Sequence, residues 1–186
     1  MRRKTGDQMR ISGMLCVGIF FCAVGVGAAQ PGKPAPPPGP VTLDLDPARG
    51  DQGKREVWGV QSGVSVAVEV VALRGAKGAT GFTATLRFDT TQVVYEGFEA
   101  GPIIPEIQTL PLLRGGMLEI GGGQFGSGAG AAQDAGTFGI LRFRTTPRFK
   151  DQTTLTLTRV RFRRRGQTQD FESSAEVVLH RRRRSL

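Results

Sequence analysis

The sequence predicts an all-β fold, a two-sheet β-sandwich with jelly-roll topology and about nine strands. From Val41 to Leu179 the apolar residues recur mainly with a period of two, and no stretch has a convincing period of 3.6. Glycine and proline, 27 and 11 residues respectively, interrupt these stretches at short intervals. Short alternating segments between turn residues are typical of sandwiches, and a single-sheet barrel is the structural alternative.

The first forty residues predict an exported protein. An apolar run over residues 11–26 follows basic residues and precedes Gly27, Ala28 and Ala29, which is the order of a secretory signal peptide over residues 1–29. The run is shorter than the about 20 residues of a membrane-spanning helix, so no stable membrane span is expected after cleavage. Residues 30–40 form a Pro-rich spacer. We therefore expect a secreted or extracytoplasmic protein.

Both cysteines, Cys16 and Cys22, lie inside the apolar run. The mature chain therefore has no disulfide framework and no thiolate metal site.

The predicted strands follow one another through the remaining chain. They cover residues 41–46, 65–71, 81–89, 93–95, 117–120, 137–145, 153–162 and 176–179. The first and last of them lie at the two ends of the domain, and we expect them to pair. In residues 153–162 the alternation changes phase around Thr158 and Arg159, which predicts a β-bulge there.

Alternation predicts which side chains face the core. In the second strand we expect Val64, Val66, Val68 and Val70 inside and Ser65, Ala67 and Glu69 outside. In the third, we expect Phe82, Ala84, Leu86 and Phe88 inside, with Thr83, Thr85 and Arg87 outside. Leu141 and Phe143 point inward from the strand over residues 137–145.

Residues 81–99, GFTATLRFDTTQVVYEGFE, resemble the cohesin family. Cohesins carry an alternating strand ending in an aromatic-Asp pair, here Phe88 and Asp89, then a short turn and a second strand leading to a glycine. The resemblance continues through residues 43–60, 101–105, 136–144 and 155–169. It implies a nine-stranded jelly-roll sandwich over residues 41–180, related in fold to carbohydrate-binding modules, followed by a basic tail over residues 181–186. The best-known cohesins hold dockerin domains.

The resemblance implies a non-catalytic binding or assembly module that engages an exported partner protein, dockerin-like or other. We expect the partner to bind a flat sheet face that carries Thr83, Thr85, Arg87, Arg161 and Arg163. Dockerin-binding cohesins commonly have Asn and Asp at the start of this strand, where the present chain has Gly81 and Thr83. The later recognition strand runs into three glycines, residues 121–123.

Two other function classes stay open. A carbohydrate-binding module for extracellular or cell-wall polysaccharide would use exposed aromatic rings, for which Trp58 and Tyr95 are the candidates for ligand stacking. A structural envelope protein would have no specific ligand. The formal charge of +9 is concentrated in two arginine-rich segments in which Phe162 is the single aromatic residue, so nucleic acid is not an expected partner.

The sequence contains no convincing catalytic set, and we predict that the protein is not an enzyme. His180 is the single histidine and lies beside the basic tail, and the glutamates are scattered. The glycine-rich residues 121–136 lack the Lys-Ser/Thr pair of a phosphate-binding loop. No cofactor is expected. Asp44, Asp46 and Asp51 raise a weak calcium hypothesis, but a turn role is favoured over a metal site.

Overall fold

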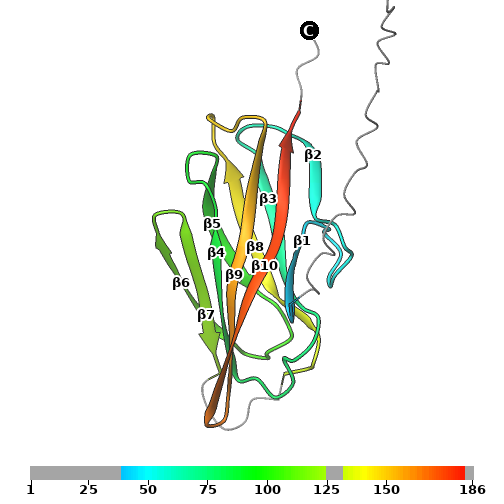
Figure 1. Cartoon of the computed structure of the whole chain (residues 1–186), viewed down its shortest axis with the longest axis vertical. Helices are drawn as coiled ribbons and strands as arrows, with labels where there is room; N and C mark the ends of the chain where they lie inside the picture. The colour runs from blue at the N-terminus through cyan, green and yellow to red at the C-terminus, as the bar shows by residue number, and fades with distance from the viewer. Residues whose placement is uncertain (1–38, 125–131, 183–186) are drawn as a thin grey trace, which may run out of the picture. The chain divides into compact units, whose positions relative to one another are not determined.

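The computed structural model describes residues 39–124 and 132–182, which form two β-sheets packed face to face (Figure 1). The predicted all-β sandwich is confirmed, with ten strands in the described residues where about nine were expected. The predicted signal peptide, most of the spacer and residues 183–186 of the basic tail lie outside the described residues. Across 39–124 and 132–182, no helix is long and apolar enough to cross a membrane.

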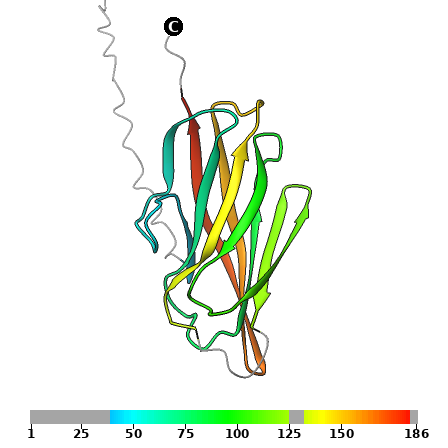
Figure 2. The same ribbon diagram turned by 180° about the vertical axis from the view of Figure 1, so that it is seen from behind.

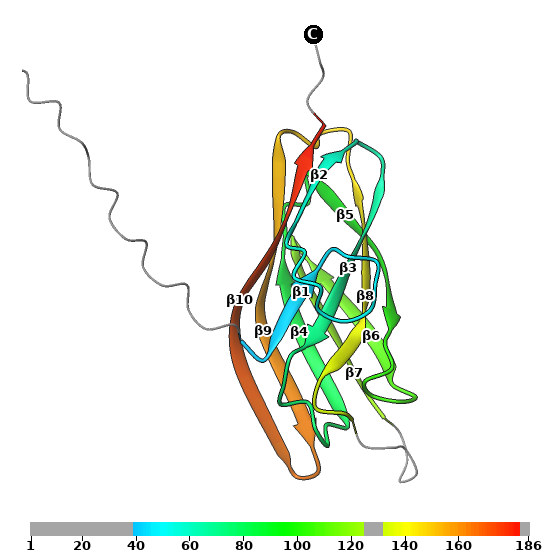
Figure 3. The same cartoon turned by 90° about the vertical axis from the view of Figure 1, so that its right-hand side faces the viewer.

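One sheet has four strands and the other has six. The four-stranded sheet has the order β1 (Val41–Asp44), β3 (Ser65–Ala72), β8 (Gly136–Thr145), β5 (Val93–Ala100). The six-stranded sheet has the order β2 (Glu56–Val60), β10 (Gln167–Arg181), β9 (Gln152–Arg164), β4 (Gly81–Arg87), β7 (Met117–Gly123), β6 (Gln108–Arg114). Figure 2 shows the four-stranded sheet from behind, with β8 in yellow, and Figure 3 shows both layers from the side.

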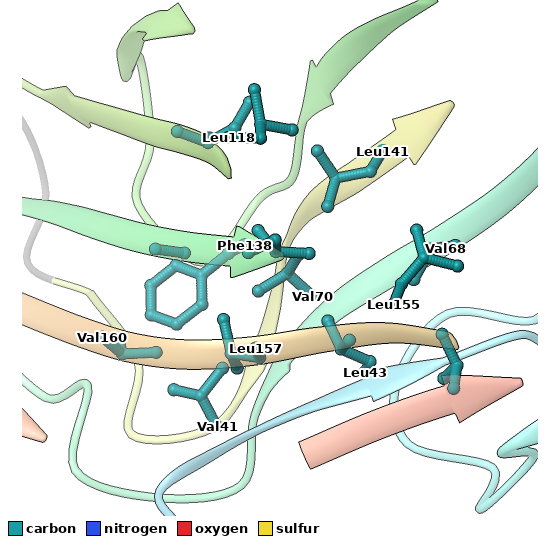
Figure 4. Packing of buried hydrophobic residues seen from close by; sticks show 14 of the residues in the cluster. Val41, Leu43, Val68, Val70, Leu118, Phe138, Leu141, Leu155, Leu157 and Val160 are labelled. Atoms are coloured by element: carbon teal, nitrogen blue, oxygen red, sulfur yellow. The ribbon is translucent and has the colours of Figure 1, made fainter. Parts of the chain in front are cut away.

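The core fills the space between the sheets, as the alternating pattern predicts. Phe82, Leu86, Phe88, Leu141 and Phe143 are all buried in one cluster, which confirms the predicted facing of β4 and β8. Side chains from both sheets meet in the centre, among them Leu118, Leu141, Val68 and Leu155 (Figure 4). Aromatic rings add to this packing because Phe138 stacks on Phe82 with ring centroids 4.4 Å apart.

The predicted β-bulge in β9 is present. Thr85 of β4 lies opposite Arg159, whereas the next residue, Leu86, lies opposite Leu157. Thr158 is therefore the extra residue, and its hydroxyl donates a hydrogen bond to the carbonyl of Thr85 at 3.1 Å. Because of this insertion, leucines before the bulge and Val160 and Phe162 after it all reach the core.

Two side chains of β3 and its lead-in face the opposite way from the prediction. Glu69, expected outside, is only 3% exposed, and Val64, expected inside, is 43% exposed. The loop over residues 45–55 covers Glu69, whose carboxylate accepts hydrogen bonds from the Gly50 N–H and the Thr137 hydroxyl. Val64 lies directly before β3, which begins at Ser65, so the alternation of the strand does not determine which way its side chain points.

The expected pairing of the first and last strands is wrong. β1 pairs with β3 in the four-stranded sheet, whereas β10 pairs with β9 and, in parallel, with β2 in the other sheet. The strand β2, which the sequence pattern missed, takes the edge of β10. β10 extends through Arg181, the first residue of the segment expected to form the basic tail.

Candidate partner-binding face

The outward surface of the six-stranded sheet carries the residues that the sequence singled out for partner binding. In β4, buried Phe82, Ala84 and Leu86 alternate with Thr83 and Thr85, which are half-buried. Arg87 ends the same row and is exposed. The strand is hydrogen-bonded on both sides, to β7 and β9, so these side chains project from a rigid part of the sheet.

The neighbouring strand β9 adds the two predicted arginines to the same face. Thr83 lies opposite Arg161, and Gly81 lies opposite Arg163. Arg161 in turn lies opposite Asp170 of β10, and its Nε donates to the Asp170 carboxylate at 2.8 Å. This hydrogen bond and the aspartate charge raise the pKa of the Arg161 guanidinium. The structure therefore brings all five predicted residues together on one face.

The other half of this face is apolar, and sequence reasoning missed it. Leu110 and Leu112 of β6 lie opposite Gly121 and Glu119 of β7, in register with the rows of Thr83 and Thr85. Leu110 is 79% exposed, which is unusual for a leucine on an ordered strand. Met117, opposite Arg87, is also exposed. These three side chains are called the apolar rim below.

Glycine separates the two halves of the face in the row of Thr83, whereas the exposed Glu119 lies between them in the row of Thr85. The row that runs from Thr83 through Gly121 to Leu110 has no side chain at its centre. A Cβ atom at Gly121 would lie 3.0 Å from the Thr83 hydroxyl oxygen, so even alanine would crowd this row. Gly123 leaves a similar gap one row further along, beside Arg163. The face therefore has a low centre where a partner backbone could approach closely.

The two candidate stacking residues are not brought together. Trp58 lies on β2 and is 68% exposed, with its ring stacked on that of His180 at 3.7 Å and an interplanar angle of 2°. Tyr95 lies on β5 of the other sheet, half-buried, with its ring edge against Phe143. Burial raises the pKa of Tyr95, whose hydroxyl has no hydrogen-bond partner within the described part of the chain. Of the two candidates, only Trp58 is largely exposed, and one face of its ring is covered by His180.

The three aspartates of the calcium hypothesis hold the loop over residues 45–55. The buried Asp44 carboxylate accepts N–H hydrogen bonds from Asp46 at 2.6 Å, Gln52 at 2.7 Å and Gly53 at 2.8 Å. It also contacts the Arg55 guanidinium, which reaches Asp51 as well. Residues 39–124 and 132–182 contain no group of three or more His, Cys, Asp or Glu side chains that could hold a metal ion. The geometry matches the favoured turn role.

Comparisons with known proteins agree on the fold. No protein-family model matches the chain, and no curated protein matches it. A non-cellulosomal cohesin from Archaeoglobus fulgidus has 15% identity over 75% of this chain and 89% of its own, with a TM-score of 0.52. A cohesin module of a family 33 glycoside hydrolase from Clostridium perfringens has 15% identity over 77% and 97%, with a TM-score of 0.55.

A further solved structure is the sixth cohesin of scaffoldin B from Acetivibrio cellulolyticus, in complex with a Cel5 dockerin. It has 16% identity over 77% of this chain and 99% of its own, with a TM-score of 0.56. These matches cover 89–99% of the three cohesins and 75–77% of this chain. The domain formed by the described residues therefore has a cohesin-like fold.

Proposed function

We propose that the chain is a non-catalytic module that binds a partner protein through the outward face of its six-stranded sheet. The observation that carries the proposal is the apolar rim, three exposed side chains on a hydrogen-bonded sheet. Removing such side chains from water on association is favourable, and rigid strands lose little conformational entropy when they bind. The glycine row beside the rim allows close approach of a partner backbone.

The charged half of the face supplies specificity. Arg161 is already paired with Asp170, whereas Arg163 and Arg87 have no ion pair within the described residues. A partner that places carboxylates opposite these two arginines and apolar side chains on the rim would match both halves. Complementary charges of this kind chiefly set specificity and the rate of association.

The solved cohesins support a protein as the class of partner. The Acetivibrio cellulolyticus cohesin was solved in complex with a dockerin. By analogy, we propose an exported partner protein, dockerin-like or other, and action outside the cytoplasm. The export part of the proposal rests on the signal-peptide pattern of residues 1–29.

The experiment is a capture assay on secreted proteins with three forms of the mature chain. The wild type is compared with the double variant Leu110→Glu, Leu112→Glu, which places charges in the apolar rim. The matched control is Val94→Glu, because Val94 is also an exposed apolar strand residue, 47% exposed, but belongs to the four-stranded sheet. We expect the double variant to weaken binding by about 2 kcal/mol or more, the scale of an interface hot spot.

The control should bind the same protein as the wild type. Equal loss in both variants, or full binding by the double variant, would show that the interface lies elsewhere.

Carbohydrate binding is the second candidate, favoured by one observation: the exposed ring of Trp58. Because Trp58 is the only tryptophan, its intrinsic fluorescence reports on this position alone. Titration with cell-wall polysaccharides should leave the emission unchanged if the protein-binding proposal holds. Saturable quenching in the wild type, together with loss of polysaccharide binding in Trp58→Ala measured by isothermal titration calorimetry, would instead support a sugar site on β2.

A further inference from the structure

A pocket of about 430 Å³ lies at the end of the sandwich where β10 finishes. Its walls are Thr91 and Gln92 from the β4–β5 turn, residues 147–150 from the β8–β9 loop, and Arg181. Figure 1 shows the β8–β9 loop and the end of β10 at the same end of the sandwich, at the top of the view. The lining contains three cationic side chains, Arg148, Lys150 and Arg181, and no carboxylate.

The buried side chain of Phe149 anchors the backbone between Arg148 and Lys150. Phe149 is fully buried in the core, and it lies between Arg148 and Lys150, which are both exposed. The Phe149 N–H donates to the Thr146 carbonyl at 3.0 Å, and the Lys150 N–H donates to the Gln92 side-chain oxygen at 2.8 Å. The buried ring and these two hydrogen bonds therefore hold the loop backbone that carries Arg148 and Lys150 in place.

Two hydrogen bonds to the segment that joins β8 and β9 hold Arg181 in place. Its backbone N–H donates to the Asp151 carbonyl at 2.9 Å, and its Nη1 donates to the Phe149 carbonyl at 2.8 Å. A guanidinium has five N–H donors, so this contact orients the group and leaves other donors for a ligand. The Gln92 amide is oriented in a similar way, because its oxygen accepts from Lys150 and its NH₂ group remains available.

The three cations are not neutralised by their surroundings. Arg148 and Lys150 have no side-chain ion pair or hydrogen bond within the described part of the chain. The acidic residues nearest in sequence to the pocket lining are Asp151, which follows Lys150, and Asp89, two residues before Thr91. The Asp89 carboxylate accepts from the Thr91 N–H and hydroxyl, at 2.8 and 2.7 Å, and Asp151 is exposed. Arg182 and two further arginines follow Arg181 in the sequence.

From this arrangement we infer that the pocket binds an oxyanion group of an anionic extracellular polymer. The planar guanidinium of Arg181 can bind two oxygens of a phosphate, sulfate or carboxylate group. Arg148 and Lys150 add positive charge to the pocket lining. The pocket shares no lining residue with the outward face of the six-stranded sheet, so a ligand there would leave the residues assigned to the partner uncovered. This inference does not rest on the partner-binding face, and only the extracellular location of the polymer rests on the proposed export.

The test measures binding of labelled polyphosphate and labelled polygalacturonate to the mature chain, with inorganic phosphate as a competitor. The main variant is Arg148→Gln, Lys150→Gln. Its matched control is Arg165→Gln, Lys77→Gln, which removes the same two charge types at the opposite end, where β9 joins β10 (bottom of Figure 1). A third variant, Arg181→Lys, keeps the charge and removes the forked geometry.

We expect the main variant to weaken polymer binding by about tenfold, since two charge-assisted contacts are lost, and the control to change it by less than about twofold. Arg181→Lys should also weaken binding, and its effect should persist at high salt because geometry is not screened. The polymer that binds more tightly identifies phosphate or carboxylate as the preferred group.

Equal losses in the main variant and the control would show diffuse attraction to a basic protein and overturn the proposal. Unchanged binding in the main variant would overturn it as well. Thermal unfolding of each variant separates loss of the pocket from loss of the fold.

Discussion

At the scale of single residues, two buried carboxylates hold the loop that connects β1 to β2. Asp44 and Glu69 lie directly opposite each other on β1 and β3. Asp44 fastens the far end of the loop over residues 45–55, and Glu69 accepts from its middle, at Gly50. The loop is thus fixed over the four-stranded sheet, which lets the chain cross to β2 in the other sheet. An acidic cluster in the sequence here has a structural role.

The first prediction follows from Asp44. Its burial raises the pKa, but the hydrogen bonds from the backbone N–H groups of Asp46, Gln52 and Lys54 outweigh burial, so the net pKa is lowered. A carboxylate with a lowered pKa in the folded state contributes stability above its unfolded pKa near 3.9, and this stability is lost as the pH falls further. Asp44→Asn should therefore lower the free energy of unfolding at pH 7 by about 1 to 3 kcal/mol.

The measurement is urea unfolding of the wild type and the variant between pH 3 and pH 7. The loss caused by Asp44→Asn should shrink toward pH 3, because the Asp44 carboxylate of the unfolded wild type is then being protonated, which favours unfolding of the wild type but not of the variant. Asp46→Asn is the control, since Asp46 is only half-buried and accepts one local N–H, from Ala48. A loss that stays constant over this range would mean that the charge of Asp44 does not contribute.

At the scale of strands, the alternation of apolar and polar residues predicted the strands that have one buried face and one exposed face. β4, β8 and β9 follow this rule, including the phase change at Thr158. β2 and β6 were missed because nearly all of their residues are exposed and neither shows alternation. β6 also contains Pro111, which a sheet tolerates at an edge. The pairing of β1 with β3 depends on long-range packing that a local pattern does not contain.

The second prediction concerns the bulge in β9. Deletion of Thr158 would remove the extra residue and shift the register of one half of the strand by one position. Either Leu155 and Leu157 or Val160 and Phe162, all fully or almost fully buried, would then face solvent. We expect the deletion variant to lose cooperative thermal unfolding, as measured by calorimetry.

Thr158→Ala serves as the control because it keeps the chain length and removes only the hydroxyl contact to Thr85. It should cost about 1 kcal/mol, the usual value of one hydrogen bond. A deletion variant as stable as Thr158→Ala would show that β9 can re-pair without its bulge.

At the scale of the whole domain, the two candidate sites differ in how far the sequence foretold them. The five predicted residues of the sheet face came from strand alternation and the cohesin resemblance, and they share one surface. The apolar rim was not foreseen, because Leu110 and Leu112 lie on an edge strand of the wider sheet. The pocket joins residues near positions 91, 148 and 181, and only the closed sandwich brings these segments together.

The last prediction separates the true tail from the end of β10. Arg181 and Arg182 are tied to the domain by three hydrogen bonds: Arg181 N–H to Asp151, Arg181 Nη1 to Phe149, and Arg182 N–H to Val60. A chain that ends at Arg182 keeps all three, so its melting temperature should stay close to that of the full mature chain. A chain that ends at His180 loses them and should be less stable by about 1 to 3 kcal/mol.

For a domain of this size such a loss lowers the melting temperature by about 3 to 10 °C. Calorimetry of the two truncated chains beside the mature chain measures the difference, and far-UV circular dichroism confirms that the strands persist. Both truncations remove arginines, so a general charge effect would shift both melting temperatures in the same direction. A drop already present in the chain that ends at Arg182 would place stabilising contacts in residues 183–186, whereas no drop in the chain that ends at His180 would mean that β10 contributes nothing beyond His180.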